Sequence, residues 1–148
     1  MQTTFPAPST QDLASRLRLA VARTARRLRQ EADGGLSPSL VAALATVERH
    51  GPLTPSRLAE IERIQRPTAT RLVATLEQQG LAVREGDPLD RRSFRVRLSP
   101  DGARVLKRLR SRKNAYLAKR LRGLDEDELA TLERATEILE RILEEERE

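Results

Sequence analysis

The sequence predicts a single, mainly α-helical domain that carries one small β-hairpin. Apolar side chains recur with the helical period along most of the 148 residues, and only the segment 81–99 changes to the period of strands. Three helix starts share one pattern, which is Leu, then Ser or Thr, then Pro, and it stands at 36–38, 53–55 and 98–100. In each of them the hydroxyl can cap the first free amides while Pro occupies the first helical position. A chain of this length suits one domain with a buried core.

The composition limits the classes of function. Lys and Arg total 28 against 22 Asp and Glu, and the net charge of +6 favours an anionic partner, either nucleic acid or a membrane surface. There is no Cys, and no nucleophile or orienting partner accompanies the single histidine, His50. We therefore expect no enzyme, no metal site and no cofactor. Since no apolar run could span a bilayer and the N-terminus lacks the order of a secretory signal, we expect a cytoplasmic protein that does not enter membranes.

Three helices come first. Residues 10–32 carry one apolar helical stripe, interrupted by Thr24, after nine residues that we expect to form a flexible tail. A second helix begins at the capped start at Ser37 and ends at Gly51, a usual terminating residue. A third, short helix follows the capped start at Thr54.

The fourth helix begins differently, with the sequence IQRPTATRLVATLE at 64–77. Arg66 precedes Pro67 where the other helices carry a hydroxyl residue, so the usual cap is missing and a cation stands at the positive end of the helix dipole. A phosphate group that binds the helix start would account for both features. The alternative is a weaker local cap from Gln65 or from the hydroxyl of Thr68.

A hairpin follows the fourth helix. LAVRE at 81–85 and SFRVRLS at 93–99 predict two strands, and GDPLDRR between them predicts a charged turn. A short helix, a tight turn, a second helix and a basic hairpin make a winged helix-turn-helix. In such folds the second helix enters the major groove of DNA, and the wing reaches the minor groove or the phosphates.

The two helices after the hairpin have opposite charge. Residues 104–122 contain nine basic residues and no acid, whereas residues 125–148 contain eleven acids and three basic residues. Gly123 separates them, and Asp125 with Glu128 forms a capping-box pattern at the start of the last helix. The opposed charges indicate either two solvated faces or packing of one helix on the other, within one chain or between two.

The outward side of the fourth helix is small and polar. At 100° per residue its apolar side packs on the domain, and the opposite side carries Arg, which suits guanine O6 and N7, and Thr, which can bond phosphate or touch a thymine methyl. A solvated face usually carries Glu or Lys, and residues 65–76 contain neither, which favours DNA contact. The apolar side comprises Ala69, Leu72, Val73 and Leu76, and the outward side comprises Pro67, Thr68, Thr70, Arg71, Ala74, Thr75 and Gln78.

The wing carries four basic side chains within seven positions, namely Arg91, Arg92, Arg95 and Arg97. Arg92, near the tip, is placed to enter a narrow minor groove, where the negative potential is strongest. Arg95 and Arg97 alternate with apolar residues, so we interpret them as the solvated face of a strand.

Residues 53–102 resemble the core of the MarR (multiple antibiotic resistance regulator) family. The matching motifs are PTATRLV on the fourth helix, LEQQGL at its end, DPLDRR in the wing and LSPDG at the start of the next helix. Together, in this order and spacing, they are specific to the family, and the flanking helices extend the resemblance over about residues 10–145.

The resemblance implies a homodimeric transcription regulator, usually a repressor, that binds pseudo-palindromic operators on double-stranded DNA. It implies a tail over 1–9 and a single domain over 10–145, with a DNA-binding lobe at 36–99 and dimerisation helices at 10–35 and 100–145. Many members release DNA when a small aromatic or phenolic anion binds between these two parts. A small-molecule effector is therefore a further expected partner, with no pocket residues assigned.

Carried over by position, the resemblance puts four residues of the fourth helix in the major groove and Arg92 in the minor groove. Asp90 becomes an organiser of the wing, through a salt bridge rather than DNA contact. Arg66, Thr75 and Arg91 are further candidates for DNA contact, and Thr54 and Ser56 are candidates for phosphate contact at the start of the third helix. The four major-groove residues are Pro67, Thr68, Thr70 and Arg71.

The chain departs from the family in two respects. Members often have Ser at Gln65 and Gly at Arg63, so the geometry of the turn is open. Aromatic side chains are few, and an effector pocket would have aliphatic walls and arginines; we expect Tyr116 to pack in the core or an interface. The lack of Cys excludes regulation by cysteine oxidation. The alternative function is a winged-helix interaction module that binds an acidic protein or membrane lipid without specific DNA recognition.

Overall fold

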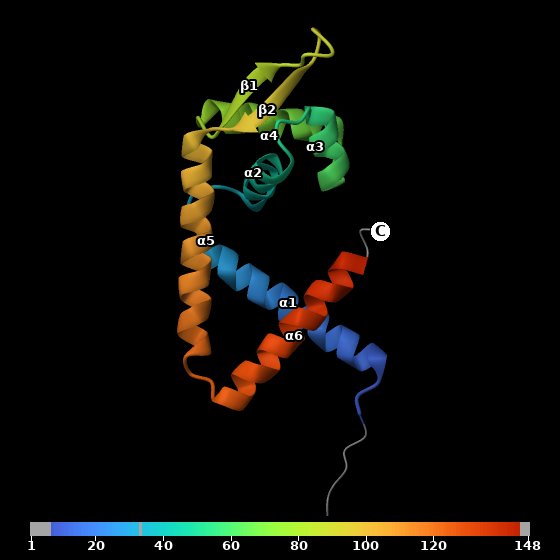
Figure 1. Ribbon diagram of the computed structural model, residues 1–148, viewed down its shortest axis with the longest axis vertical. Helices are drawn as coiled ribbons and strands as arrows, with labels where there is room; N and C mark the ends of the chain where they lie inside the picture. The colour runs from blue at the N-terminus through green and yellow to red at the C-terminus, as the bar shows by residue number, and fades with distance from the viewer. Residues whose placement is uncertain (1–6, 33, 146–148) are drawn as a thin grey trace, which may run out of the picture.

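The computed structural model describes residues 7–32 and 34–145, and it confirms a mainly helical chain with one two-stranded antiparallel hairpin (Figure 1). Of the expected flexible tail, residues 1–6 lie outside the described residues. In chain order the elements are α1 (Thr10–Glu31), α2 (Pro38–His50), α3 (Pro55–Glu62), α4 (Arg66–Gln78), β1 (Ala82–Gly86), β2 (Phe94–Leu98), α5 (Pro100–Leu121) and α6 (Glu126–Glu145).

The hydroxyl residues that were expected to cap helices do so. The side-chain oxygens of Ser37, Thr54 and Ser99 accept hydrogen bonds from the backbone N–H groups three residues later, at 3.3, 3.2 and 3.0 Å. The capping box at the start of α6 also forms, because Asp125 and Glu128 exchange side-chain-to-backbone bonds of 2.8 and 3.1 Å. These local signals therefore define the helix starts correctly.

Helix α4 has no side-chain cap, but it begins one residue earlier than the sequence suggests. The backbone carbonyl of Gln65 accepts the first helical bond from Ala69 N–H at 3.1 Å, so Gln65, not Arg66, occupies the capping position. Its side chain bonds no first-turn amide, and Thr68 supplies no cap either. The expectation that Arg66 replaces a capping hydroxyl is wrong: Arg66 is the first helical residue and Pro67 the second.

The turn between α3 and α4 closes without glycine. Arg63 has a left-handed backbone conformation, with φ 53° and ψ 47°. The N–H of Ile64 bonds the carbonyl of Ala59 at 3.0 Å, which gives the usual closure of a helix by a left-handed residue. Arg63 therefore adopts the strained conformation that glycine would take freely. At the other end of α4, Gly80 terminates the helix with φ 72°, as its position predicts.

The hairpin is held at the middle of β2 by a segment that the sequence does not identify. β1 and β2 pair from Ala82 opposite Leu98 to Gly86 opposite Phe94. Leu53, in the loop before α3, bridges to Val96 through two backbone hydrogen bonds of 3.1 and 2.8 Å. This bridge ties β2 to the helix-turn-helix.

One apolar core joins α2, α3, α4, the hairpin and the first half of α5. The inward side of α4 is confirmed for Ala69, Val73 and Leu76, which are buried, whereas Leu72 is half-buried. Leu106 shows that α5 belongs to the same core. The largest side chains with less than 2 % exposure are Leu44, Val47, Leu58, Val73, Leu76, Val96 and Leu106.

The helices α1, α5 and α6 extend away from this core (Figure 1). α1 packs on α5, whereas α6 turns away from α5 after Gly123. Among the described residues no ion pair joins α5 to α6. Large apolar side chains remain 39–51 % exposed on α1 and 40–62 % exposed on α6. They are Leu13, Leu17, Leu19 and Val21 on α1, and Leu129, Leu132, Ile142 and Leu143 on α6.

Candidate nucleic-acid interface

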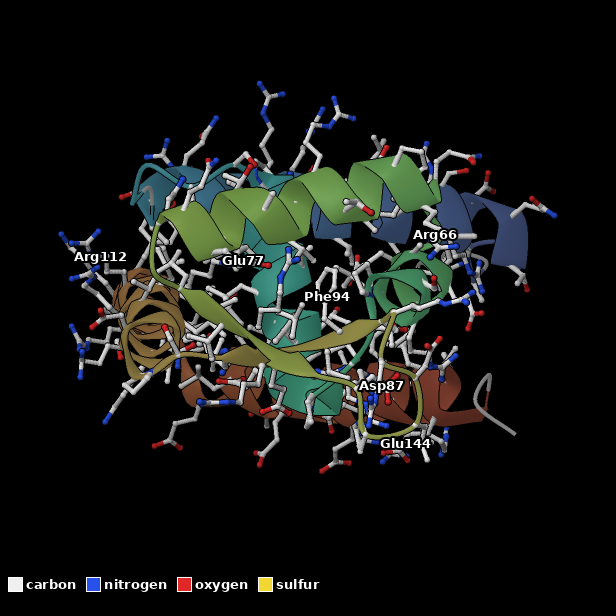
Figure 2. The ribbon with its side chains drawn as sticks, turned by 90° about the horizontal axis from the view of Figure 1, so that it is seen from above. Arg66, Glu77, Asp87, Phe94, Arg112 and Glu144 are labelled. Carbon is white, nitrogen blue, oxygen red and sulfur yellow. The ribbon has the colours of Figure 1, made fainter. Side chains whose placement is uncertain are left out.

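The helix α4 and the hairpin lie together at one end of the molecule, away from α1 and α6 (Figure 1). The view from above this end shows Arg66 at the start of α4 and Glu77 near its end, with the hairpin crossing beside the helix (Figure 2). Of the candidate contacts on α4, Thr68 and Thr75 are half-buried. The others, Arg66, Pro67, Thr70 and Arg71, are exposed.

Two of the threonine hydroxyls already donate within the helix. The Thr70 hydroxyl donates to the carbonyl of Arg66 and the Thr75 hydroxyl to the carbonyl of Arg71, both at 3.0 Å. A Thr hydroxyl that already donates in this way can only accept a further hydrogen bond, and the methyl group of the same side chain remains available for an apolar contact. It suits an adenine or cytosine amino group, or a thymine methyl, better than a phosphate oxygen, which needs a donor.

The start of α4 offers positive charge. Its first turn contains no acidic residue, no side chain caps its amides, and Arg66 is exposed there. Helix dipole, uncapped amides and guanidinium thus coincide at one point, which is the arrangement that binds a phosphate.

The tip of the wing is organised by aspartates. Asp90 Oδ1 accepts a hydrogen bond from the backbone N–H of Arg92 at 2.9 Å, and Asp87 Oδ1 accepts one from Leu89 N–H at 3.0 Å. The ion pair of the tip joins Asp87 to Arg95 at 3.5 Å, so Asp90 acts through the backbone and not through the expected salt bridge. Asp90 thus fixes the backbone at Arg92, two residues further along the turn.

Four arginines at this end carry charge that no described carboxylate neutralises. Arg66, Arg71, Arg91 and Arg92 are exposed, and none forms an ion pair with a carboxylate in the described part of the chain. Arg95 and Arg97 differ, because they pair with Asp87 and Glu85 inside the hairpin. This agrees with their interpretation as a strand face.

The two hydroxyl candidates at the start of α3 are half-buried. Thr54 Oγ1 accepts the capping bond from Arg57 N–H, which leaves the hydroxyl hydrogen free to donate. Both Thr54 and Ser56 therefore remain chemically suited to a phosphate oxygen.

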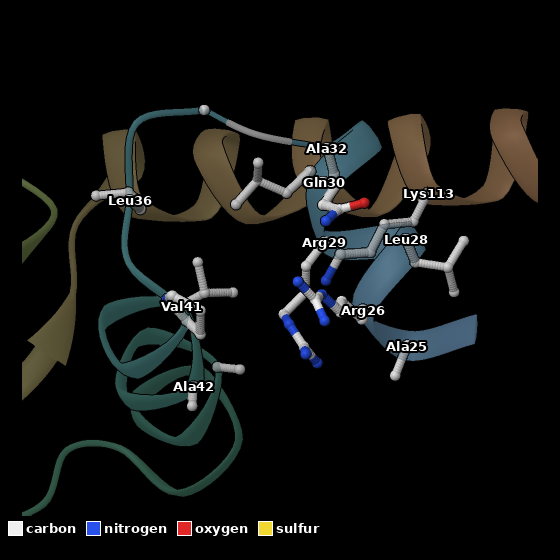
Figure 3. Close-up of a pocket in the computed structure, with 14 residues that line it drawn as sticks. Ala25, Arg26, Leu28, Arg29, Gln30, Ala32, Leu36, Val41, Ala42 and Lys113 are labelled. Carbon is white, nitrogen blue, oxygen red and sulfur yellow. The ribbon is translucent and has the colours of Figure 1, made fainter. Parts of the chain in front are cut away.

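A second feature, for which the sequence assigns no residues, is a cavity of about 880 Å³ between α1, α2 and α5. Figure 3 shows that the side chains of Arg26, Arg29 and Lys113 converge on this space. No Asp, Glu or aromatic residue lines it among the residues described. The spacing of Arg26 and Arg29 on one helix could have suggested part of this cluster, but Lys113 joins it only through the packing of α5. The apolar walls comprise Ala25, Leu28, Leu36, Val41, Ala42, Ala45 and Leu109.

Tyr116 lies apart from that cavity. Its hydroxyl accepts a hydrogen bond from Arg27 Nε at 3.2 Å, and the guanidinium groups of Arg27 and Arg120 lie 5.6 and 5.5 Å from its ring centroid. The hydrogen bond from Arg27, helped by one from Arg120, lowers the pKa of Tyr116. Tyr116, on α5, is half-buried, lies outside the apolar core and meets α1 through Arg27.

The described residues include no helix that is long and apolar enough to cross a membrane. Within those same ranges, no three His, Asp or Glu side chains are grouped so that they could hold a metal ion.

Comparison with known proteins identifies the family. Residues 34–93 match the model of the MarR family. An uncharacterised helix-turn-helix transcriptional regulator from Mycobacterium leprae is 37% identical over 90% of this chain and 94% of its own length. The helix-turn-helix transcriptional repressor MdtR of Bacillus subtilis is 28% identical over 64% of this chain and 61% of its own length.

A solved structure extends the match to the whole fold. A putative transcriptional regulator from Pseudomonas aeruginosa superposes with a TM-score of 0.81 at 37% identity, over 92% of this chain and 98% of that one. The correspondence covers the outer helices as well as the winged helix-turn-helix. The chain therefore belongs to the MarR family of DNA-binding transcriptional regulators and is not an enzyme.

Proposed function

We propose that this protein is a homodimeric repressor that binds a pseudo-palindromic operator and leaves it when a small anion binds. The observation that carries the DNA-binding part is a set of four exposed arginines on α4 and the wing, none of which forms an ion pair with a carboxylate that the structure describes. Residues 36–99 would form the DNA-binding lobe, and 10–35 with 100–145 the dimerisation part, in a single cytoplasmic protein. Repression is supported by the similarity to MdtR, which is named a repressor.

In this proposal α4 enters the major groove by its first turns. Arg66 and the helix start bind a phosphate, and Arg71 reads guanine through O6 and N7. Pro67, Thr68, Thr70 and Thr75 are small enough to let α4 approach the base edges closely. Arg91 and Arg92 follow the phosphates and the flanking minor groove, where an arginine gains from the negative potential.

Dimerisation is supported by the outer helices. Fully burying one Leu or Val side chain contributes about 1.5–3 kcal/mol, and a single chain leaves eight large apolar side chains exposed on α1 and α6. Basic α5 and acidic α6 also complement each other, although no ion pair joins them within the described part of one chain. A second copy of the chain can cover the exposed apolar side chains and pair its charges with those of α5 and α6. The two-fold axis that results would match a pseudo-palindromic operator.

Release by an effector is supported by the cavity between α1, α2 and α5. Three cationic side chains converge there without a described acid, and the remaining walls are aliphatic. Such a site suits an anion with an aliphatic body, for example a medium-chain carboxylate, better than a ring that needs aromatic stacking. The cavity lies where α1 and α5 meet α2 of the DNA-binding lobe, so occupancy can change the angle between that lobe and the dimerisation helices.

A gel-shift assay with the DNA upstream of the protein's own gene tests the central claim. We expect the protein to bind one fragment in preference to a scrambled competitor, and to bind as a dimer. A fragment that competes no better than scrambled DNA would contradict specific recognition and favour the interaction module. A reporter gene under that fragment distinguishes repression, in which deletion of the regulator raises expression, from activation.

A further inference from the structure

An ion pair fixes the wing to the helix α4. Arg84, on β1, donates from both Nε and Nη2 to Oε1 of Glu77, at 3.2 and 3.1 Å. Its guanidinium also lies 3.5 Å from the ring centroid of Phe94, the first residue of β2. Figure 2 shows the Glu77 side chain pointing from α4 toward the hairpin, with Phe94 beside it. We call Glu77, Arg84 and Phe94 the wing clamp.

The wing clamp differs from the other ion pairs of the hairpin. Arg84 stands opposite the buried residue Val96, so it lies on the face of the hairpin that is turned toward the domain. Arg95 and Arg97 lie on the other face and pair with acids of the hairpin itself. Among the residues that the structure describes, the pair of Arg84 with Glu77 is the one ion pair between the hairpin and α4.

The clamp is too exposed to act mainly on stability. The Arg84 side chain is 50% and the Glu77 side chain 25% exposed, and ion pairs of this kind contribute little to the free energy of folding. A planar guanidinium that bonds a carboxylate through two N–H groups and also stacks on a ring nevertheless holds a defined geometry. Its effect is therefore expected in the angle between wing and helix.

A small change in that angle displaces the wing tip substantially. Because a strand rises about 3.3 Å per residue, the turn lies on the order of 10–15 Å beyond Arg84, and a tilt of about 15° moves it by roughly 3 Å. The minor groove is only about 6 Å wide. A tilt of this size would take Arg92 out of register with the groove while α4 remains in place.

We propose that Arg84 and Glu77 are positioning residues that hold the wing at the angle at which α4 and Arg92 engage the two grooves together. The inference rests on the proposed mode of DNA binding. Neither residue touches DNA in this role: they act through the orientation of the wing.

Footprinting of the two grooves tests the proposal. The variants are Arg84→Met, which keeps the aliphatic stem, and Glu77→Gln; the matched control is Arg97→Met, since Arg97 is 54% exposed and also forms one ion pair in the same hairpin. The probe is the upstream DNA fragment that the parent binds. Dimethyl sulfate reports guanine N7 in the major groove, and hydroxyl radicals report the sugars along the minor groove.

We expect both clamp variants to keep the protection of guanine N7 at saturating protein and to lose the flanking minor-groove protection, with affinity lower by about 10-fold. Arg97→Met should keep both footprints. The double variant should lose no more than either single one, because the two side chains act as one pair. Minor-groove protection that survives Arg84→Met, or an equal loss of both footprints, overturns the proposal. A parent protein without any specific footprint refutes the proposed function itself, and this inference with it.

A distance measurement without DNA separates the two possible failures. The chain has no Cys, so Ala74→Cys on α4 and Leu89→Cys at the wing tip provide unique labelling sites. Pulsed electron paramagnetic resonance, with labelled chains diluted by unlabelled ones, should give a narrow distance distribution in the labelled parent and with Arg97→Met. With Arg84→Met it should become broader or shift. An unchanged distribution contradicts the clamp, whatever the DNA assays show.

Discussion

The salt dependence of operator binding is the sharpest test of the electrostatic part of the interface. Arg66, Arg91 and Arg92 are exposed and form no ion pair in the described chain, and they are the residues proposed to contact phosphates and the minor groove. Arg71 is left out of the count because it is proposed to read guanine, so a dimer brings about six such charges to the phosphates and the minor groove. If each displaces one counterion from DNA, log K falls with log salt with a slope of about −5, so affinity drops about 10³-fold from about 50 to 200 mM salt. The number of these exposed arginines thus predicts the size of the salt effect on DNA affinity as well as its sign.

Replacing Arg92 by Ala removes two of these charges from the dimer. The slope should then become less steep, at about −3.6, and the same increase in salt concentration should lower the affinity only about 10²-fold. The measurement is a fluorescence anisotropy titration of the labelled operator fragment at several salt concentrations. Arg97→Ala is the control, because Arg97 pairs with Glu85 at 3.3 Å and should leave the slope unchanged. An Arg92→Ala slope equal to the parent's, or an equal reduction by Arg97→Ala, would refute the assignment.

Three further predictions follow from other parts of the molecule. Arg71→Ala should reduce discrimination between operator and scrambled DNA in competition gel shifts. An equal loss of affinity for both DNAs would contradict the proposal that Arg71 reads a base. Gln65→Ser should place a hydroxyl at the capping position of α4 and raise the free energy of unfolding by about 1 kcal/mol, which a thermal melt would show as a higher Tm. Arg66→Ser should weaken DNA binding without raising the free energy of unfolding. Octanoate should release operator DNA at a lower concentration than octanol does, because only octanoate carries the negative charge that the cationic cavity binds. In Arg29→Gln the concentrations of the two compounds that release DNA should lie closer together. Equal potency of the two compounds on the parent protein would argue against an anion site.

Local signals in the sequence predicted much of the fold. Ser37, Thr54 and Ser99 cap their helices because a hydroxyl residue directly before a Pro at the first helical position lies within reach of the free amides of the first turn. The inward side of α4 was predictable for a similar reason, since Ala69, Val73 and Leu76 must share a face at helical spacing. The start of α4 was misplaced by one residue because the pattern of the other helices was transferred to a segment without a hydroxyl.

The candidate DNA contacts were predictable only as residue types on a face. The structure shows hydrogen bonds that the residue types did not predict. The Thr70 hydroxyl donates a hydrogen bond to the backbone carbonyl of Arg66, and Asp90 accepts one from the backbone N–H of Arg92 rather than forming a salt bridge. The Thr hydroxyl and the Asp carboxylate each have several possible partners nearby, and residue types on a face do not decide which partner each side chain takes.

The sequence by itself determined the order of the elements and the face of α4 that remains free, because both depend on neighbours three or four residues away. Tertiary structure alone decided which charges remain unpaired. It brings Lys113 to Arg26 and Arg29 across a cavity, and it sets Arg84 against Glu77 and Phe94. Those contacts join separate elements, and their geometry follows from how the helices and the hairpin pack on one core.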